Sequence, residues 1–270
     1  MKILRMTIVI VFLVVLAAFS YVFVNEKLNA DYTYPEITIN EDMIDVSLSA
    51  THEELLRGVT AYDEKDGNLT DKIIIESISK FVEPRVSVVT YAVCDGDNHV
   101  ATGTRRIRYT EYTPPRFTMS GSLVYSLTDK IKITDVIGAV DVIDGDIGKS
   151  VIINASDFES NTEGVFTISV QASNSKGDVI TMSLPIYVEN NGLSAPEIEL
   201  TDYLVYTKVC EPIDPQNYLK SISTENIDPE SYMIDTDYNP DAAGTYQAHF
   251  YVTDTNGRKG HSILTIIVEE

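Results

Sequence analysis

Two acidic loops hold the residues of this sequence whose types and spacing could do chemistry. One reads Ala-Tyr-Asp-Glu-Lys-Asp-Gly-Asn over 61–68, and the other reads Ala-Val-Asp-Val-Ile-Asp-Gly-Asp over 139–146. Both follow the pattern Asp-x-x-Asp-Gly-Asn/Asp. The side chains at the pattern positions, which can all donate an oxygen ligand, are Asp63, Asp66, Asn68, Asp141, Asp144 and Asp146.

These six side chains have two interpretations, a calcium site and a structural turn. Calcium takes about six to eight oxygen ligands. The side chains and backbone carbonyls of one such loop together could supply about three or four of them. Neither loop has the EF-hand spacing. As a turn, the first Asp caps the end of a strand, Asp-Gly reverses the chain, and Leu69 or Ile147 returns to the core. The turn is favoured, calcium is the alternative, and no other cofactor is indicated.

A third segment of the chain lacks this signature. It reads Ser-Ile-Ser-Thr-Glu-Asn-Ile-Asp over 221–228, so that Ser223, Asn226 and Asp228 stand where the acids stand in the first two loops. Any metal-binding role would therefore be confined to the first two.

No catalytic constellation is found. The carboxylate pair of a glycosidase faces one cleft at about 5–9.5 Å, and no pair stands out among 41 acids. The chain has no Gly-x-Ser-x-Gly, Walker or Gly-x-Gly-x-x-Gly motif, so we expect it not to be an enzyme. Its histidines lack the spacing of a zinc helix, and we expect the last two to be solvated: His52, His99, His249 and His261.

The charge balance excludes one class of partner. The 270 residues carry 41 acids and 20 basic residues, for a net charge of −21. Such a surface repels the phosphate backbone, so nucleic acid is not expected as a partner. It would also be repelled by anionic lipid headgroups, but it suits a body held away from a membrane.

The N-terminus supplies a membrane segment. Residues 7–24 form an uncharged apolar run, preceded by Lys2 and Arg5. As a helix this run spans about 27 Å, close to the thickness of a bilayer's hydrocarbon core. The basic flank predicts that residues 1–6 are cytoplasmic, 7–24 are a signal anchor, and 25–34 are a juxtamembrane linker to an extracellular body. The alternative is a cleaved signal peptide and a secreted protein.

The remainder of the chain repeats one pattern three times. Segments with similar openings begin at Pro35, Pro115 and Pro196, 80 and 81 residues apart. Each ends in two long alternating runs around a polar turn. The repeat predicts modules at 35–111, 115–189 and 196–270, joined by linkers at 111–115 and 189–196, of which the second should bend more easily.

Alternation in the long runs predicts strands buried on one face. We therefore expect three all-β sandwiches in tandem behind the N-terminal helix, with one short helical turn at Thr51. Cys94 and Cys210 fall in different modules and are expected to be free thiols. Gly96, Gly177 and Gly257 should supply positive φ in the turns. The inward residues are Val89, Tyr91, Val93, Ile168, Val170, Ala172, Ala248, Phe250 and Val252.

Residues 58–73 and 137–151, each followed by a hairpin of the type Tyr-Ala-Val-Cys-Asp-Gly-Asp-Asn, carry a resemblance. They are similar to the bacterial Ig-like modules described from certain pesticidal crystal proteins, which are related to hyalin-repeat and cadherin-like sandwiches. The resemblance is good in the first two modules, while the third keeps only the terminal hairpin. It implies seven-stranded sandwiches used for adhesion, spacing or ligand display, without catalytic residues.

Together these features predict a membrane-anchored extracellular surface protein of bacterial Ig-like modules, serving as a stalk, adhesion or ligand-display module. The alternative is a carbohydrate-binding accessory module of the cell surface, which calcium could rigidify. The partner would be a protein or a carbohydrate. The third module is the expected binder, because it would lie furthest from the membrane and departs most from the pattern. It is also rich in tyrosines, which could bind a partner, although filling edges and corners is the favoured interpretation: Tyr203, Tyr206, Tyr218, Tyr232, Tyr238, Tyr246 and Tyr251.

Overall fold

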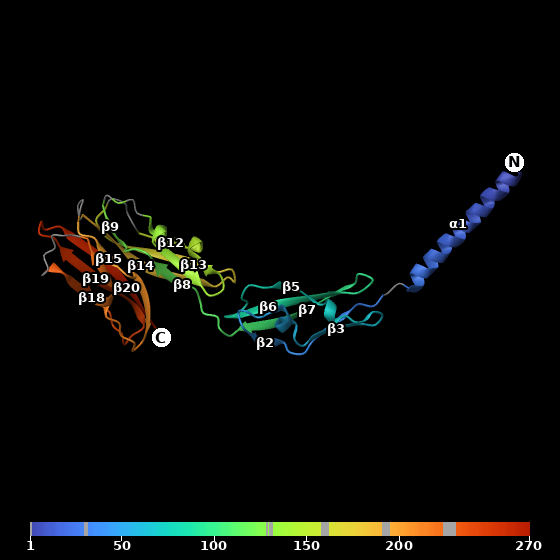
Figure 1. Ribbon diagram of the computed structural model, residues 1–270, viewed down its shortest axis with the longest axis horizontal. Helices are drawn as coiled ribbons and strands as arrows, with labels where there is room; N and C mark the ends of the chain where they lie inside the picture. The colour runs from blue at the N-terminus through green and yellow to red at the C-terminus, as the bar shows by residue number, and fades with distance from the viewer. Residues whose placement is uncertain are drawn as a thin grey trace. The chain divides into compact units, whose positions relative to one another are not determined.

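The computed structural model describes residues 2–29, 32–127, 129, 132–157, 162–190, 195–223 and 231–270. The chain forms two compact units, Met1–Glu111 and Tyr112–Glu270. The first contains the N-terminal helix and one β-sandwich, and the second contains two β-sandwiches (Figure 1).

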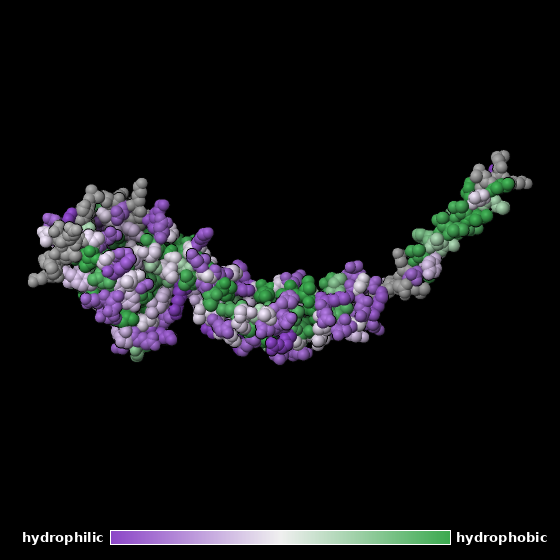
Figure 2. Space-filling model, viewed as in Figure 1, coloured by the Kyte–Doolittle hydropathy of each residue, from purple (hydrophilic) through white to green (hydrophobic). Residues whose placement is uncertain are grey.

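The N-terminal apolar run is a single helix, α1 (Lys2–Asn29). Its segment Arg5–Asn25 is long and apolar enough to cross a membrane, and none of it is buried in the described protein. Figure 2 shows its surface as a continuous apolar band. The helix includes the predicted anchor 7–24 and continues through 25–29, which we had expected to be linker.

The first sandwich has two sheets of three and four strands. The predicted helical turn is α2 (His52–Leu56), which begins at a capping box made by Thr51 and Glu54. The three-stranded sheet has the order β1 (Glu36–Ile39), β3 (Val59–Asp63), β4 (Gly67–Asn68), and it is followed by a 3₁₀ turn at Thr70–Lys72. The four-stranded sheet has the order β2 (Met43–Val46), β7 (Val100–Tyr109), β6 (Val86–Cys94), β5 (Ile74–Ile78).

The second sandwich repeats this plan. One sheet has the order β11 (Gly145–Asp146), β10 (Ile137–Asp141), β8 (Arg116–Met119). The other has the order β12 (Ile152–Ser156), β13 (Gly164–Ser173), β14 (Val179–Glu189), β9 (Val124–Ser126). Two 3₁₀ turns lie at Ile133–Asp135 and Gly148–Ser150.

The third sandwich keeps the larger sheet and has a reduced smaller one. The smaller sheet is β15 (Ile198–Leu200) with β17 (Leu219–Ile222), next to a 3₁₀ turn at Pro215–Tyr218. The larger sheet has the order β16 (Leu204–Lys208), β20 (Lys259–Glu269), β19 (Gly244–Thr253), β18 (Met233–Thr236).

One topological feature recurs in all three sandwiches. The second strand of each runs parallel to the last long strand, as β2 does with β7, β9 with β14 and β16 with β20. Every described sheet takes all its strands from one third of the chain. The predicted all-β sandwich fold is therefore confirmed, and its described strands lie within 35–111, 115–189 and 196–270.

The predicted inward faces are confirmed. All nine inward residues of β6, β13 and β19 are buried, with exposed fractions of 0–2%. Cys94 and Cys210 are both exposed and free, as expected. The expectation for the turn glycines holds for Gly177 and Gly257 but is wrong for Gly96: in the first hairpin the positive φ falls on Asn98. Asn is the residue that best tolerates this conformation after glycine.

The second and third sandwiches are not separate bodies joined only by a bending linker. Leu204 belongs to the buried core of the second sandwich, and Tyr206 and Ile267 pack against it. The Tyr206 hydroxyl donates to the carbonyl of Phe117 at 3.2 Å, and Arg116 pairs with Glu269. The two sandwiches thus form one packed unit.

Candidate functional site

The first acidic loop is built around the buried carboxylate of Asp63, which is 1% exposed. Its Oδ1 accepts from the backbone N–H groups of Lys65 and Asp66 at 2.8 and 2.9 Å. Asp66 then accepts from the N–H of Gly96 in the β6–β7 hairpin, and Asn68 accepts from Thr70. A Cβ at Gly96 would lie 2.9 Å from Asp66, so glycine is required there for close approach rather than for φ.

The second acidic loop repeats the arrangement. Asp141 Oδ1 accepts from the N–H groups of Ile143 and Asp144, and its Oδ2 accepts from Asn174 Nδ2 at 3.1 Å. Asp144 accepts from the N–H and the hydroxyl of Ser175. At the exposed end of the loop, Asp146 accepts from the N–H of Gly148 at 2.8 Å.

The segment that enters each of these two sandwiches is attached to the same loop. Thr33 donates to Asp63 Oδ2 at 3.4 Å. In the second sandwich, Tyr112 is buried, and its hydroxyl donates to Asp178 at 2.6 Å and accepts from Asn174 at 2.9 Å. Residue 112 lies in the predicted linker 111–115, yet the structure makes it part of the second sandwich.

All six candidate side chains therefore accept hydrogen bonds from their own turn or from the adjoining hairpin. Within the described residues, no group of three or more His, Cys, Asp or Glu side chains is arranged to hold a metal ion. These hydrogen bonds are the ones that a structural turn requires, and calcium stays the alternative to be tested. The equivalents Asn226 and Asp228 lie outside the described residues.

The tyrosines of the third sandwich do not form an exposed platform. None of the seven is exposed, and five of them pack against its core: Tyr203, Tyr218, Tyr232, Tyr238 and Tyr246. Of the other two, Tyr206 contacts the second sandwich and Tyr251 stacks on His261 with ring centroids 4.4 Å apart. The interpretation as residues that fill edges and corners is the one that the structure favours.

The expectation that His249 and His261 are solvated is wrong. His249 Nδ1 lies 3.0 Å from His261 Nε2, and both rings are partly buried. His261 Nδ1 in turn lies 2.6 Å from Glu189 on β14 of the second sandwich. The edges of both rings contact Tyr187. Sequence alone placed the two histidines across one hairpin, but only the packing of two sandwiches buries them.

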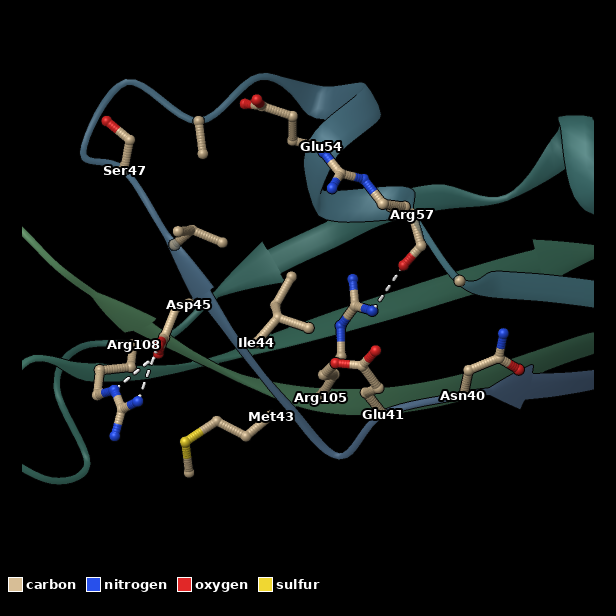
Figure 3. Close-up of a pocket in the computed structure, with 13 residues that line it drawn as sticks. Asn40, Glu41, Met43, Ile44, Asp45, Ser47, Glu54, Arg57, Arg105 and Arg108 are labelled. Carbon is tan, nitrogen blue, oxygen red and sulfur yellow. Dashed lines mark hydrogen bonds and ion pairs between the residues drawn. The ribbon is translucent and has the colours of Figure 1, made fainter.

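A further candidate site is a cavity of about 660 Å³ in the first sandwich (Figure 3). It lies between β2, the segment that carries α2, and the end of β7. Its lining is polar and charged, with three arginines and three acids: Arg57, Arg105, Arg108, Glu41, Asp45 and Glu54. The volume falls within the range of small-molecule sites, about 300–1,000 Å³. Sequence analysis missed this site, since its residues come from separate segments without a motif.

The charges of this cavity are held in different ways. Asp45 accepts two hydrogen bonds from Arg108 at 2.7 and 2.8 Å, and the Arg108 guanidinium holds the pKa of the Asp45 carboxyl below its usual range. Glu54 accepts from the N–H of Thr51 at 2.8 Å and so completes the cap of α2. Arg105 is buried and donates to the carbonyl of Leu55 and to that of Arg57; Figure 3 shows the second of these bonds.

Comparison with known proteins gives distant relatives. No protein-family model matches the chain. It is 24% identical over 142 residues to an uncharacterised 81.3 kDa protein of Acholeplasma phage L2, and 25% identical over 134 residues to the pesticidal crystal protein Cry22Aa of Bacillus thuringiensis. These matches cover 49% and 48% of this chain but 18% of each relative. The chain spans less than a fifth of their length, and the likeness to Cry22Aa supports an Ig-like relationship only loosely.

Solved structures with similar sandwiches include carbohydrate-binding and adhesion proteins. The CBM51-2 and INT domains of Clostridium perfringens ZmpB, in complex with GlcNAc, are 15% identical at a TM-score of 0.23, over 87% of this chain and 42% of that one. Drosophila N-cadherin EC1-4 is 12% identical at a TM-score of 0.22, over 89% and 76%. TM-scores this low add nothing to what the sheets of the structure show. The chain is an all-β protein of several sandwiches behind one apolar helix.

Proposed function

We propose that this protein is a membrane-tethered, outward-facing surface protein whose sandwiches act as a stalk and a binding module without catalysis. The observation that carries the proposal is the uncharged run 7–24 of helix α1, which is exposed and is joined to a β-sandwich body that carries nearly all of the acid. A helix of this composition is stable in a bilayer, and the acidic body stays in water on the outer side.

Binding rather than catalysis is supported by the state of the acids. The pattern acids of the two loops accept backbone and side-chain hydrogen bonds from their own turns and hairpins, which supports a structural role for them rather than one as general acid or base. We had expected the third module to be the binder. Because its tyrosines pack inward, the cavity of the first sandwich now has the better claim.

The topology is tested on intact cells that express the full chain with a C-terminal tag. External protease should remove the tag, while the fragment with α1 stays in the membrane fraction. A tag protected until the cells are lysed would contradict the proposal. Release of the uncut body into the medium would support the cleaved-signal alternative instead.

A second candidate function is carbohydrate binding at the cell surface. The polar, arginine-containing cavity of Figure 3 favours it, because sugar hydroxyls need fixed donors and acceptors. A screen of the full chain against immobilised glycans tests this candidate, and the absence of any bound glycan contradicts it.

A further inference from the structure

The cavity of the first sandwich holds a buried cation that no carboxylate neutralises within the described part of the chain. Arg105 is 2% exposed, and its guanidinium donates to two neutral carbonyls. Its Nε–H is buried and has no hydrogen-bond partner. The ion pairs on the same strand belong to its neighbours Arg106 and Arg108. A buried charge without a counter-charge is unfavourable, so the cavity favours an incoming anion.

Arg57 adds a second positive charge to the lining of the cavity. It follows α2, its side chain is exposed, and none of the ion pairs of the described first sandwich includes it. Figure 3 shows the Arg105 guanidinium pointing toward the Arg57 carbonyl, while the Arg57 side chain extends toward α2 and Glu54. Two acids of the lining, Glu41 and Glu54, have no described ion pair; both are exposed, and Glu54 caps α2.

From this arrangement we infer that the cavity is a binding site for a saccharide that carries a carboxylate, such as a uronic acid. Arg57 donates to the carboxylate at the rim, where its planar guanidinium matches the two oxygens. Arg105, buried in the same lining without a paired carboxylate, supplies a positive field, which low-dielectric surroundings strengthen. Asn40 is a polar lining group that could contact the sugar hydroxyls. The inference rests on the carbohydrate-binding candidate and does not depend on the membrane tether.

The test uses the full chain in detergent micelles, labelled with ¹⁵N-arginine and titrated with glucuronate, glucose and acetate. We expect glucuronate to bind at least tenfold more tightly than glucose or acetate and to shift the Arg105 Nε–H resonance. Arg57→Gln should weaken glucuronate binding about tenfold, and added salt should weaken it further. Glu41→Gln should tighten it, because a like charge is removed from the lining. Arg106→Gln is the matched control: it lies on the same strand, pairs with Glu83 and does not line the cavity.

The outcomes test three points separately: the charge of the ligand, its saccharide part and the location of the site. Equal binding of glucose and glucuronate, or an Arg57→Gln variant that binds like Arg106→Gln, overturns the acidic ligand but leaves a sugar site. Equal binding of acetate and glucuronate overturns the saccharide. If none of the three shifts the Arg105 resonance, the cavity is not the site, while the tethered topology stands on its own protease test.

Discussion

At the scale of single residues, the acidic loops illustrate how one pattern supports two functions. Asp-x-x-Asp-Gly-Asn/Asp offers oxygens to a metal, but it offers the same oxygens to backbone N–H groups of a tight turn. Asp63 and Asp141 occupy equivalent positions, are both buried, and each cap the two N–H groups that follow. The loops thus hold strand, hairpin and entry segment together.

Asp141→Ala should destabilise the second unit by about 2–3 kcal/mol, because it leaves two backbone donors and Asn174 Nδ2 without their acceptor. Asp146→Ala is the matched control: it is exposed and accepts one hydrogen bond, so it should cost about 1 kcal/mol or less. Chemical denaturation measures both.

Calcium is tested in the same material. A ligand that binds only the folded state raises the melting temperature, and we expect the same melting temperature in EDTA and in millimolar calcium. A rise with calcium that Asp141→Ala abolishes would show that the loops are metal sites after all.

At the scale of elements, β19 and β20 bring His249 and His261 against β14. Burial and the neighbouring His261 lower the pKa of His249 below its ordinary value of 6.5, while Asp235, Asp237 and Glu189 act in the opposite sense. The unfolded chain therefore binds a proton more readily than the folded one. The resulting stability is present in full above about pH 6.5 and is lost as the pH falls through the lower, folded-state pKa.

The melting temperature of the second unit should consequently fall by a few degrees between pH 7.5 and pH 5, as followed by calorimetry. His249→Gln should reduce this dependence. The carboxyls of Asp95 and Asp254 titrate in a more acidic range: burial raises their pKa, but the hydrogen bonds from His99 and from Arg258 outweigh it and lower it overall. If the melting temperature of His249→Gln depends on pH as steeply as that of the unmodified protein, other groups cause the dependence.

At the scale of the whole molecule, the described body is one sandwich in the first unit and a packed pair in the second. The pair depends on Tyr206, which contacts the core of the second sandwich and donates to Phe117. The second and third copies of the sequence repeat therefore form one packed unit.

Tyr206→Ala should loosen this pair. Truncating a half-buried aromatic should cost about 2 kcal/mol, somewhat less than a fully buried one. We expect faster proteolysis between residues 189 and 204 and a larger radius of gyration in small-angle scattering. Tyr62→Ala, at a tyrosine of the first sandwich that is 62% exposed, serves as the control. Identical behaviour of the two variants would mean that the contact does not hold the pair together.

The sequence by itself determined what depends on local periodicity. Alternation identified which face of β6, β13 and β19 is buried, the 80-residue spacing located the three sandwiches, and the uncharged run located α1. These features follow from the direction of side chains along a strand and from apolar composition. Both depend only on residues that are near one another in the sequence.

Only the tertiary structure decided which distant groups meet. Arg57 and Arg105 are 48 residues apart and carry no motif, yet packing α2 against β7 brings them to one cavity. Glu189 and His261 meet because the second and third sandwiches pack together, which the linker sequence alone did not predict. Long-range contacts set the charge and the burial of side chains at such sites. A repeat in the sequence does not show whether its copies contact each other in space.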